Sequence, residues 1–324
     1  MKRFSFKKID AFAAAGSAGN PAACVYLTEE ASLEDMQRIA RELGGFVSEV
    51  VYCLPAREAG LDYSLNYYSS ECEVAFCGHG TISCMYDLIM HNPGLLNREE
   101  IMIRTLRGDL AVYNRIDTMD AVYISAPLPA ATPATKPLQN TTVCTTKTLE
   151  NTTPHNAHTT EALQKATVAA RLGLPDTHLD KTLPLDLINA GLDTLIVPIR
   201  SLMDILDIWP DEAALKDFCI GTGVDIITVF TREVHDGANT VHTRVFAPRF
   251  GYLEDPATGS GNSAVGYYLL QNGLWEGGPI SIEQGPGPVF NTIKLDSIER
   301  PDGSRQVLFG GAAAVRIEGH YFLY

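Results

Sequence analysis

The chain has 324 residues, 45% apolar and 20% charged, the composition of an ordinary globular protein with room for two domains. Its 25 basic and 39 acidic residues give a net charge of −14, which argues against a large nucleic-acid or acidic-membrane surface. Seven cysteines without a CxxC pair argue against a structural zinc site and favour reduced thiols in the cytoplasm. No segment approaches the roughly 18 apolar residues of a membrane span.

In the first half of the chain, short alternating segments predict strands, and a glycine turn precedes a helix. We expect strands at residues 4–12, 22–27, 46–54, 63–68, 101–105, 110–115 and 121–124. Helices are expected at 33–43, where apolar residues recur at helical spacing, and from about 81 to 90, after Gly78-His79-Gly80.

Residues 127–160 differ in character, with five prolines, many threonines and few large apolar residues, and are interpreted as a linker and surface insertion. The second half repeats the style of the first. Helices are expected at 161–172, 212–219 and about 260–271, and strands at 194–198, 226–231, 241–246, 279–284, 292–295, 306–309 and 314–318. We therefore expect an α+β chain with domains 1–126 and 161–311, and residues from about 312 to 324 packing on the first domain.

One sequence pattern occurs twice, 181 residues apart. Glu73 precedes Gly78-His79-Gly80 by five positions, and Glu254 precedes Gly259-Ser260-Gly261 in the same way. The start of a helix has backbone N–H groups without helical partners, which bind anions. The two turns predict two helix N-termini that face one small acidic ligand, and the open alternative is two unrelated glycine turns.

The first turn holds two candidate residues. His79 can donate a hydrogen bond or move a proton, or it can be a surface histidine that suits the turn. Cys77 can be a thiolate activated by the helix end, or a small buried residue. Thr258 holds the mirrored position in the second half, so a symmetric two-thiol site is excluded.

The second turn holds Asp255, which either faces the ligand or fixes the turn before Pro256. Ser260 is expected to be the N-cap of the helix and can also face the ligand. No Gly-Lys-[Ser/Thr] follows, which excludes a P-loop. No apolar strand immediately precedes the glycines, which argues against dinucleotide binding.

Glu49 is a carboxylate in the apolar segment 44–52. Val47, Glu49 and Val51 are expected to share one face of a strand, which favours a buried carboxylate over a solvent-facing one. Burial is expected to raise the pKa of Glu49 toward neutrality, which suits a group that acts as both acid and base.

Taken in order, these segments resemble the phenazine biosynthesis-like (PhzF) isomerase family. The resemblance covers most of the chain, is weakest over residues 130–160, and includes a highly specific block at 254–260. It rests on Asp10-Ala-Phe, Gly19-Asn-Pro-Ala-Ala, Ser48-Glu49, Glu73 with Cys77-Gly78-His79, and Glu254-Asp-Pro-Ala-Thr-Gly-Ser260. Gly80, where alanine is frequent, and Gly261-Asn262 depart from the family pattern, so the substrate is not carried over.

The resemblance implies the diaminopimelate epimerase fold, with two pseudo-symmetric domains, each a β-barrel-like sheet around a central helix, and the active site between them. It implies that Glu49 is the general acid/base that shifts a proton between carbons of a small acid, assisted by His79 and Asp255. The residues expected to bind the substrate are Cys77, Gly78, Gly80, Gly259, Ser260 and Gly261.

We therefore expect a cofactor-independent isomerase of a small unsaturated, amino or hydroxy carboxylic acid, without a metal. It is expected to be cytoplasmic and homodimeric, with no nucleic-acid or membrane partner. Two alternatives stay open: a one-thiol epimerase or racemase that uses Cys77, and a non-catalytic metabolite-binding protein on the same fold.

Overall fold

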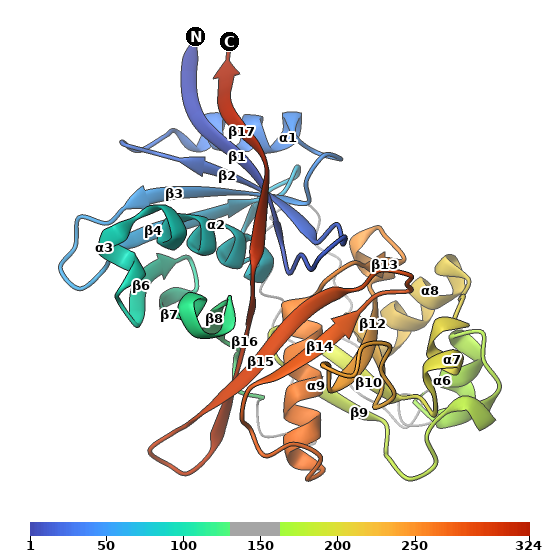
Figure 1. Ribbon diagram of the computed structural model, residues 1–324. Helices are drawn as coiled ribbons and strands as arrows, with labels where there is room; N and C mark the ends of the chain where they lie inside the picture. The colour runs from blue at the N-terminus through green and yellow to red at the C-terminus, as the bar shows by residue number, and fades with distance from the viewer. Residues whose placement is uncertain (130–162) are drawn as a thin grey trace. The chain divides into compact units, whose positions relative to one another are not determined.

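The computed structural model describes residues 1–129 and 163–324 (Figure 1). These residues form two compact units: residues 1–125 and 310–324 make up unit 1, and residues 126–129 and 163–309 make up unit 2. Both units mix helices with a sheet of parallel and antiparallel pairs, so the α+β class is confirmed. Most of the predicted linker, 127–160, lies outside the described residues.

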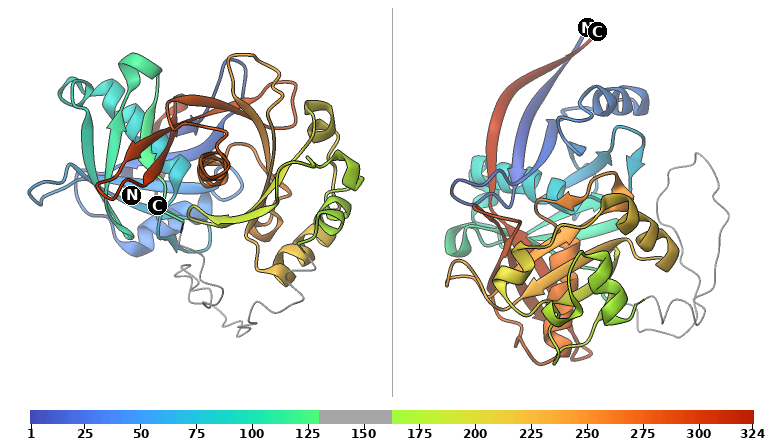
Figure 2. Two further views of the ribbon diagram at one scale, coloured as in Figure 1. Left: turned by 90° about the horizontal axis from the view of Figure 1, so that it is seen from below. Right: turned by 90° about the vertical axis from the view of Figure 1, so that its right-hand side faces the viewer.

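The sheet of unit 1 is built from strands of both ends of the sequence. Its strands are β1 (Lys2–Ala11), β2 (Asn20–Tyr26), β3 (Glu49–Pro55), β4 (Tyr63–Tyr68), β5 (Glu73–Val74), β6 (Glu100–Thr105), β7 (Gly108–Asn114), β8 (Val122–Ser125) and β17 (Ala313–Leu323). They pair in the order β17-β1-β2-β3-β4-β6-β7-β8, with β5 also on β4. β17 runs beside β1 over almost the whole length of both strands (Figure 2).

The two parallel pairs of unit 1, β2–β3 and β4–β6, are each joined by a helical crossover, as parallel pairing requires. α1 (Leu33–Glu42) joins β2 to β3, and α2 (Gly78–His91) with α3 (Pro93–Leu96) lies between β4 and β6; the short α4 (Ile116–Met119) precedes β8. Ser32 is the N-cap of α1, and its side chain accepts a hydrogen bond from the Asp35 N–H.

α2 is the central helix of unit 1. It contacts β1, β2, β3, β8 and β17, which include both ends of the pairing order. The helix is therefore surrounded by strands, and most of its residues are buried. A helix buried on several sides needs no polar face, which explains why its sequence lacks a clear amphipathic stripe.

In unit 2, the pairs from β9 to β15 follow the directions of the pairs from β1 to β7 in unit 1. β9 (Asp186–Asn189), β10 (Asp193–Pro198), β11 (Ile226–Thr231), β12 (Val241–Phe246), β14 (Ile280–Gln284) and β15 (Asn291–Glu299) pair in that order, and β13 (Glu254–Asp255) also pairs with β12. The pairs β10–β11 and β12–β14 are parallel, as β2–β3 and β4–β6 are in unit 1. β16 (Arg305–Gly311) leads the chain back toward β17.

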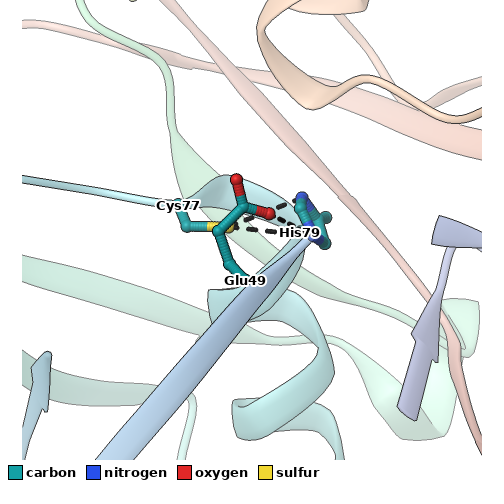
Figure 3. Close-up of side chains that lie close together, drawn as sticks. All are labelled: Glu49, Cys77 and His79. Atoms are coloured by element: carbon teal, nitrogen blue, oxygen red, sulfur yellow. Dashed lines mark hydrogen bonds and ion pairs between the residues drawn. The ribbon is translucent and has the colours of Figure 1, made fainter. Parts of the chain in front are cut away.

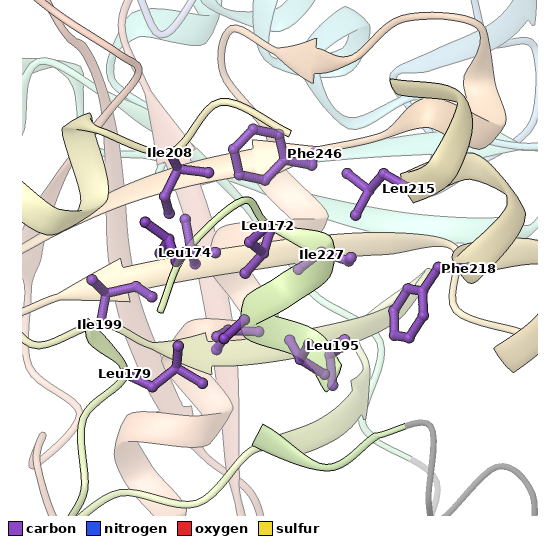
Figure 4. Close-up of a cluster of buried hydrophobic side chains, with 14 of the residues drawn as sticks. Leu172, Leu174, Leu179, Leu195, Ile199, Ile208, Leu215, Phe218, Ile227 and Phe246 are labelled. Carbon is purple, nitrogen blue, oxygen red and sulfur yellow. The ribbon is translucent and has the colours of Figure 1, made fainter. Parts of the chain in front are cut away.

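The helices of unit 2 lie in its crossovers and its first segment. They are α6 (Lys165–Arg171), α7 (Leu202–Leu206), α8 (Glu212–Thr222) and α9 (Gly259–Gln271), with 3₁₀ turns η1 (Asp176–His178) and η2 (Pro248–Phe250). α9 contacts β9, β10, β11 and β15 and is almost entirely buried. A separate apolar cluster joins the helices to the sheet through side chains such as Leu172, Leu195, Leu215, Ile227 and Phe246 (Figure 4). Each such buried side chain contributes about 1.5 to 3 kcal/mol.

Two boundaries differ from the sequence prediction. The strand expected at 46–54 begins only at Glu49, because the Val47 N–H still bonds the Leu43 carbonyl at the end of α1. Val47 therefore packs with Val50 and Tyr52, and it does not share a face with Glu49 as predicted. α2 begins already at Gly78, so the glycine turn is the first turn of the helix.

In residues 1–129 and 163–324, no helix combines the length and the apolar character needed to cross a membrane.

Candidate active site

Three predicted side chains of unit 1, Glu49, Cys77 and His79, converge at the start of α2 (Figure 3). Glu49 is the first residue of β3, Cys77 is the N-cap of α2, and His79 is in its first turn. The Cys77 Sγ lies 3.5 Å from His79 Nδ1, and Glu49 Oε2 lies 3.3 Å from His79 Nε2. The imidazole is thus placed between a thiol and a carboxylate.

The Cys77 side chain takes the place of a conventional capping group. Cys77 has extended backbone angles, and its sulfur accepts the Gly80 N–H at 3.3 Å. Burial raises the pKa of the Cys77 thiol, which is only 7% exposed. The Gly80 N–H and the neighbouring His79 favour the thiolate, but burial outweighs them, so the thiol is neutral and the activated thiolate considered from the sequence is disfavoured.

Ser48 adds a further polar group beside the imidazole. Its hydroxyl lies 3.1 Å from His79 Nε2 and donates to the Pro21 carbonyl at 3.3 Å. Nε2 therefore has both Ser48 and Glu49 as neighbours. The hydroxyl helps to fix the orientation of the ring.

The carboxylate of Glu49 and the imidazole of His79 form a partly accessible pair. The two side chains are 23% and 14% exposed, so a small ligand can reach both. Glu49 Oε2 is close enough to Nε2 for an ion pair, but within the described residues no donor reaches it with the angle of a hydrogen bond. The carboxylate thus retains capacity to accept a proton.

The pKa of Glu49 does not follow the sequence prediction. Burial raises the pKa of this carboxyl, but His79, with smaller contributions from Ser48 and Cys77, outweighs burial, and the pKa lies below its ordinary value. Burial lowers the pKa of His79, while Cys77 and Glu49 raise it well above its ordinary value. The predicted elevation of the Glu49 pKa is therefore wrong: the pair is ionised near neutral pH, as carboxylate and imidazolium.

Glycines allow each central helix to approach its sheet closely. A methyl group added at Gly80 would lie 2.7 Å from Val51 Cγ2, and one added at Gly261 would lie 2.9 Å from Thr228 Oγ1. Val51 and Thr228 are each the third residue of their strands. Gly80 and Gly261 are both buried, so their observed role is helix–sheet packing.

The second predicted turn is organised by Thr258. Thr258 is the N-cap of α9, so the prediction that Ser260 is the cap is wrong, because the cap lies two residues earlier and the helix begins at Gly259. The Thr258 hydroxyl donates to Asp255 Oδ2 at 2.6 Å. Asp255 and Ser260 are half-buried, and Gly259 is buried against the Phe309 ring.

Gln284 holds this turn in place and was not predicted from the sequence. Its Oε1 accepts from the Thr258 N–H at 2.9 Å and from the Asn262 amide at 2.6 Å. Its Nε2 donates to the Asp255 carbonyl at 2.7 Å and to the Thr258 hydroxyl at 3.2 Å. A single buried amide thus fixes the cap and the residue that carries the candidate carboxylate.

The two repeated glutamates, Glu254 and Glu73, differ in how strongly they are bound to neighbouring strands. Glu254 forms a two-bond ion pair with Arg244, at 2.9 and 2.8 Å, and the Arg244 side chain is 1% exposed. Glu73, in the corresponding place, accepts a single hydrogen bond of 3.2 Å from the Asn66 amide within the described residues. Both glutamates tie the short strand before the helix to its neighbour.

The chain thus has an α+β fold, and its Glu49–His79 pair has the geometry of an acid–base site. The family model described as phenazine biosynthesis-like protein (PhzC-PhzF) matches residues 9–319. The chain therefore belongs to the phenazine biosynthesis-like family, as the sequence predicted.

Several named proteins are similar to this chain over most of its length. Antisense-enhancing sequence 1 of Schizosaccharomyces pombe is 27% identical over 328 residues, which cover 100% of both chains. The uncharacterized isomerase YfhB of Bacillus subtilis is 28% identical, covering 88% of this chain and 87% of its own. Trans-2,3-dihydro-3-hydroxyanthranilate isomerase of Pseudomonas chlororaphis is 25% identical, covering 86% and 84%. The second and third of these relatives are named as isomerases, and the predicted class of enzyme is confirmed.

A solved structure shares the fold. The crystal structure of the Bacillus anthracis phenazine biosynthesis protein of the PhzF family is 22% identical and superimposes with a TM-score of 0.80 over 100% of both chains.

Proposed function

We propose that the chain is a cofactor-independent isomerase that moves a proton on a small carboxylic acid, with Glu49 as the general acid/base. The observation that supports this proposal is the Glu49–His79 pair, 3.3 Å apart, at the start of a buried helix. Its carboxylate is ionised in the free protein and partly accessible.

The proposed step begins with Glu49 as a base. A carboxylate oxygen takes a proton from one carbon of the substrate, and the electron pair left behind shifts the adjacent double bond. The protonated Glu49 then gives the proton to another carbon. The nearby His79 imidazolium favours the carboxylate form, so it promotes this second transfer.

The substrate carboxylate is proposed to bind at helix N-termini. The first N–H groups of α2, from Gly78 onward, and of α9, from Gly259 onward, have no partners within their helices. Asp255 and Ser260 are proposed to orient the substrate and Asp255 to assist the transfer, supported by their place in the first turn of α9 or just before it. Cys77, Gly80 and Gly261 are proposed to shape the site around it.

We also propose the finer features of the fold that the family resemblance implied. Pseudo-symmetry of two domains, each with a barrel-like sheet around α2 or α9, is supported by the recurrence of parallel and antiparallel pairs in units 1 and 2. A cytoplasmic homodimer without nucleic-acid or membrane partners follows from composition and family resemblance. Light scattering on the purified protein tests the dimer.

The experiment is incubation in deuterated water with a panel of unsaturated, amino and hydroxy carboxylic acids that includes trans-2,3-dihydro-3-hydroxyanthranilate. Mass spectrometry then detects solvent deuterium on carbon. Glu49→Gln should lower the labelling rate at least about 100-fold and leave binding of the same acid, measured by calorimetry, in place. Glu73→Gln is the matched control in the same unit and should keep near-normal labelling.

Two results would contradict the proposal. Full labelling by Glu49→Gln removes this residue from the mechanism. Binding of an acid by the wild type without any labelling supports the metabolite-binding alternative. The one-thiol alternative, favoured by the 3.5 Å Cys77–His79 contact, predicts instead that Cys77→Ser abolishes labelling.

A further inference from the structure

We propose that Arg107 binds a second carboxylate of the substrate, so that the substrate is a short dicarboxylic acid. This inference rests on the proposed function, which places the reacting carbon at Glu49 and one carboxylate at the helix N-termini. The sequence pattern did not indicate Arg107. The residue lies in the two-residue loop that joins β6 to β7, between the paired residues Thr105 and Gly108.

The pairing of β3, β4 and β6 places this loop at the Glu49 end of the sheet. β4 runs antiparallel to β3, and its last residue, Tyr68, pairs with Val50, the residue after Glu49. β6 runs parallel to β4, so both strands end on this side. Two strand spacings of about 4.8 Å separate β3 from β6, which is about 10 Å in all. Glu49 and Arg107 therefore lie at the same end of one sheet, two strands apart.

A contact with Phe76 directs Arg107 toward the start of α2. The guanidinium carbon of Arg107 lies 5.8 Å from the centroid of the Phe76 ring, within the range of a cation–π interaction. Phe76 immediately precedes Cys77, the N-cap of α2. Its ring also contacts the Tyr67 ring edge to face at 5.8 Å, and the Tyr67 hydroxyl lies 2.7 Å from that of Thr81 in the first turn of α2. The guanidinium is thus held beside the candidate active site.

Arg107 differs from the other arginines around β6 because it has no acidic partner within residues 1–129 and 163–324. Arg98 donates to Asp62 at 2.7 Å. Arg104 donates to Asp109 at 2.8 Å. Arg107 is exposed, so a ligand can reach it. In a chain with 39 acidic and 25 basic residues, an arginine held on a ring without a carboxylate points to an anion from outside the chain.

The charges of the site favour a carboxylate at Arg107. Glu49 and His79 form an ionised pair whose charges sum to zero, so the pair by itself attracts no anion. Arg107 adds one positive charge. Its planar guanidinium can rest on the Phe76 ring and still offer two parallel N–H groups to a carboxylate. Because the helix N-termini hold one carboxylate in the proposed function, the group at Arg107 is a second one.

The test compares two acids, trans-glutaconate and trans-3-pentenoate, which has a methyl group in place of one carboxyl group. Binding of each acid to the full chain is measured by calorimetry near neutral pH. The wild type should bind glutaconate at least about tenfold more tightly than pentenoate. Arg107→Leu should lose this preference through weaker glutaconate binding, with pentenoate binding unchanged. Arg107→Lys, which keeps the charge without the planar fork, should keep part of the preference.

Arg57→Leu is the matched control. Arg57 is also exposed, but it follows the opposite end of β3, after Pro55, so the variant should keep the wild-type preference. Circular dichroism checks that each variant is folded. A loss of the preference in Arg57→Leu would attribute it to the overall charge of the chain and would refute the role of Arg107.

Three results would overturn the proposal: no binding of glutaconate, equal affinity of the wild type for the two acids, or an unchanged preference in Arg107→Leu. Deuterium labelling of the same acids distinguishes this inference from the proposed function. A preference that depends on Arg107, without labelling of any acid, refutes the isomerase and supports the binding role of Arg107. Labelling of glutaconate with the same KM in wild type and Arg107→Leu supports the isomerase and refutes that role.

Discussion

Glu49 and Ile226 occupy the same place in the strand pairing of their units. Glu49 is the first residue of β3 and Ile226 is the first residue of β11, and each strand runs parallel to the strand before it. The residue after each of them pairs with the last residue of the next strand, β4 or β12. Ile226 is 1% exposed and cannot accept a proton. The proposed acid–base group therefore belongs to one unit only, although the pairing order belongs to both.

The first prediction concerns the pH dependence of activity. His79→Gln removes the imidazolium that lowers the pKa of Glu49, so burial then dominates and the pKa rises. The acidic limb of kcat/KM should move to higher pH in the variant. A deuterium-labelling profile against pH, in chelator-treated buffer, measures this shift. An unchanged acidic limb would show that His79 does not influence the pKa of Glu49.

The same pair predicts a pH dependence of stability. Glu49 has a lowered pKa in the folded protein, so it stabilises the fold above its unfolded pKa of about 4.3 and loses this effect as the pH falls through the folded value. His79 has a raised pKa, so its contribution is complete below its unfolded pKa of about 6.5 and is lost as the pH rises through the folded value. Urea unfolding should give the largest difference between wild type and His79→Gln between about pH 4.3 and 6.5.

The third prediction concerns helix packing beside the site. Gly80→Ala places a methyl group 2.7 Å from Val51 Cγ2 and should cost about 1 to 3 kcal/mol of unfolding free energy. Gly221→Ala, in α8 with open space around it, is the control and should gain up to about 1 kcal/mol. Urea unfolding measures both; equal effects in the two variants would show that close packing at Gly80 is unimportant.

The fourth prediction compares the two repeated glutamates. Glu254→Gln leaves the buried guanidinium of Arg244 without its negative partner and should cost about 3 kcal/mol. Glu73→Gln keeps an oxygen that accepts from the Asn66 amide and should cost under about 1 kcal/mol. Thermal and urea unfolding of the two variants test this difference, and a larger loss for Glu73→Gln would contradict it.

The fifth prediction concerns Gln284. Gln284→Leu removes the acceptor of two buried donors, the Thr258 N–H and the Asn262 amide, at the start of α9 and should cost at least about 2 kcal/mol. If Asp255 orients the substrate as proposed, the variant should also raise KM. Gln37→Leu, which removes an amide that donates to the Ser69 carbonyl, is the control with a small expected effect. A normal KM in Gln284→Leu would argue against the turn as a binding element.

Short segments rich in β-branched and aromatic residues could be predicted closely as strands from the sequence, as β4, β11 and β12 show. The start of β3 could not, because Val47 is apolar yet lies in the turn that follows α1, where its N–H bonds the Leu43 carbonyl. Glu49 and His79 were both recognisable as candidates. The direction of the Glu49 pKa depends on a 3.3 Å contact between segments 30 residues apart, which spacing does not reveal.

Arg244 and Gln284 show a second limit of sequence reasoning. Both are polar residues in strands whose neighbours are buried. A charged residue such as Arg244 within a strand bounded by apolar residues is a usable signal of a buried ion pair. The sequence does not show which of several acidic residues is its partner, because the choice depends on the pairing of β12 with β13.

The pairing of β17 with β1 also sets an order for folding during synthesis. β1 pairs with β2 on one side, but its other side stays open until residues 313–323 have left the ribosome. All strands from β9 to β15 leave the ribosome earlier, and they pair with one another. Unit 2 can therefore complete its sheet while unit 1, which holds Glu49 and His79, still lacks a strand. The sheet of unit 1 therefore contains the first strand to be synthesised, β1, but it is completed only when the last strand, β17, pairs with it.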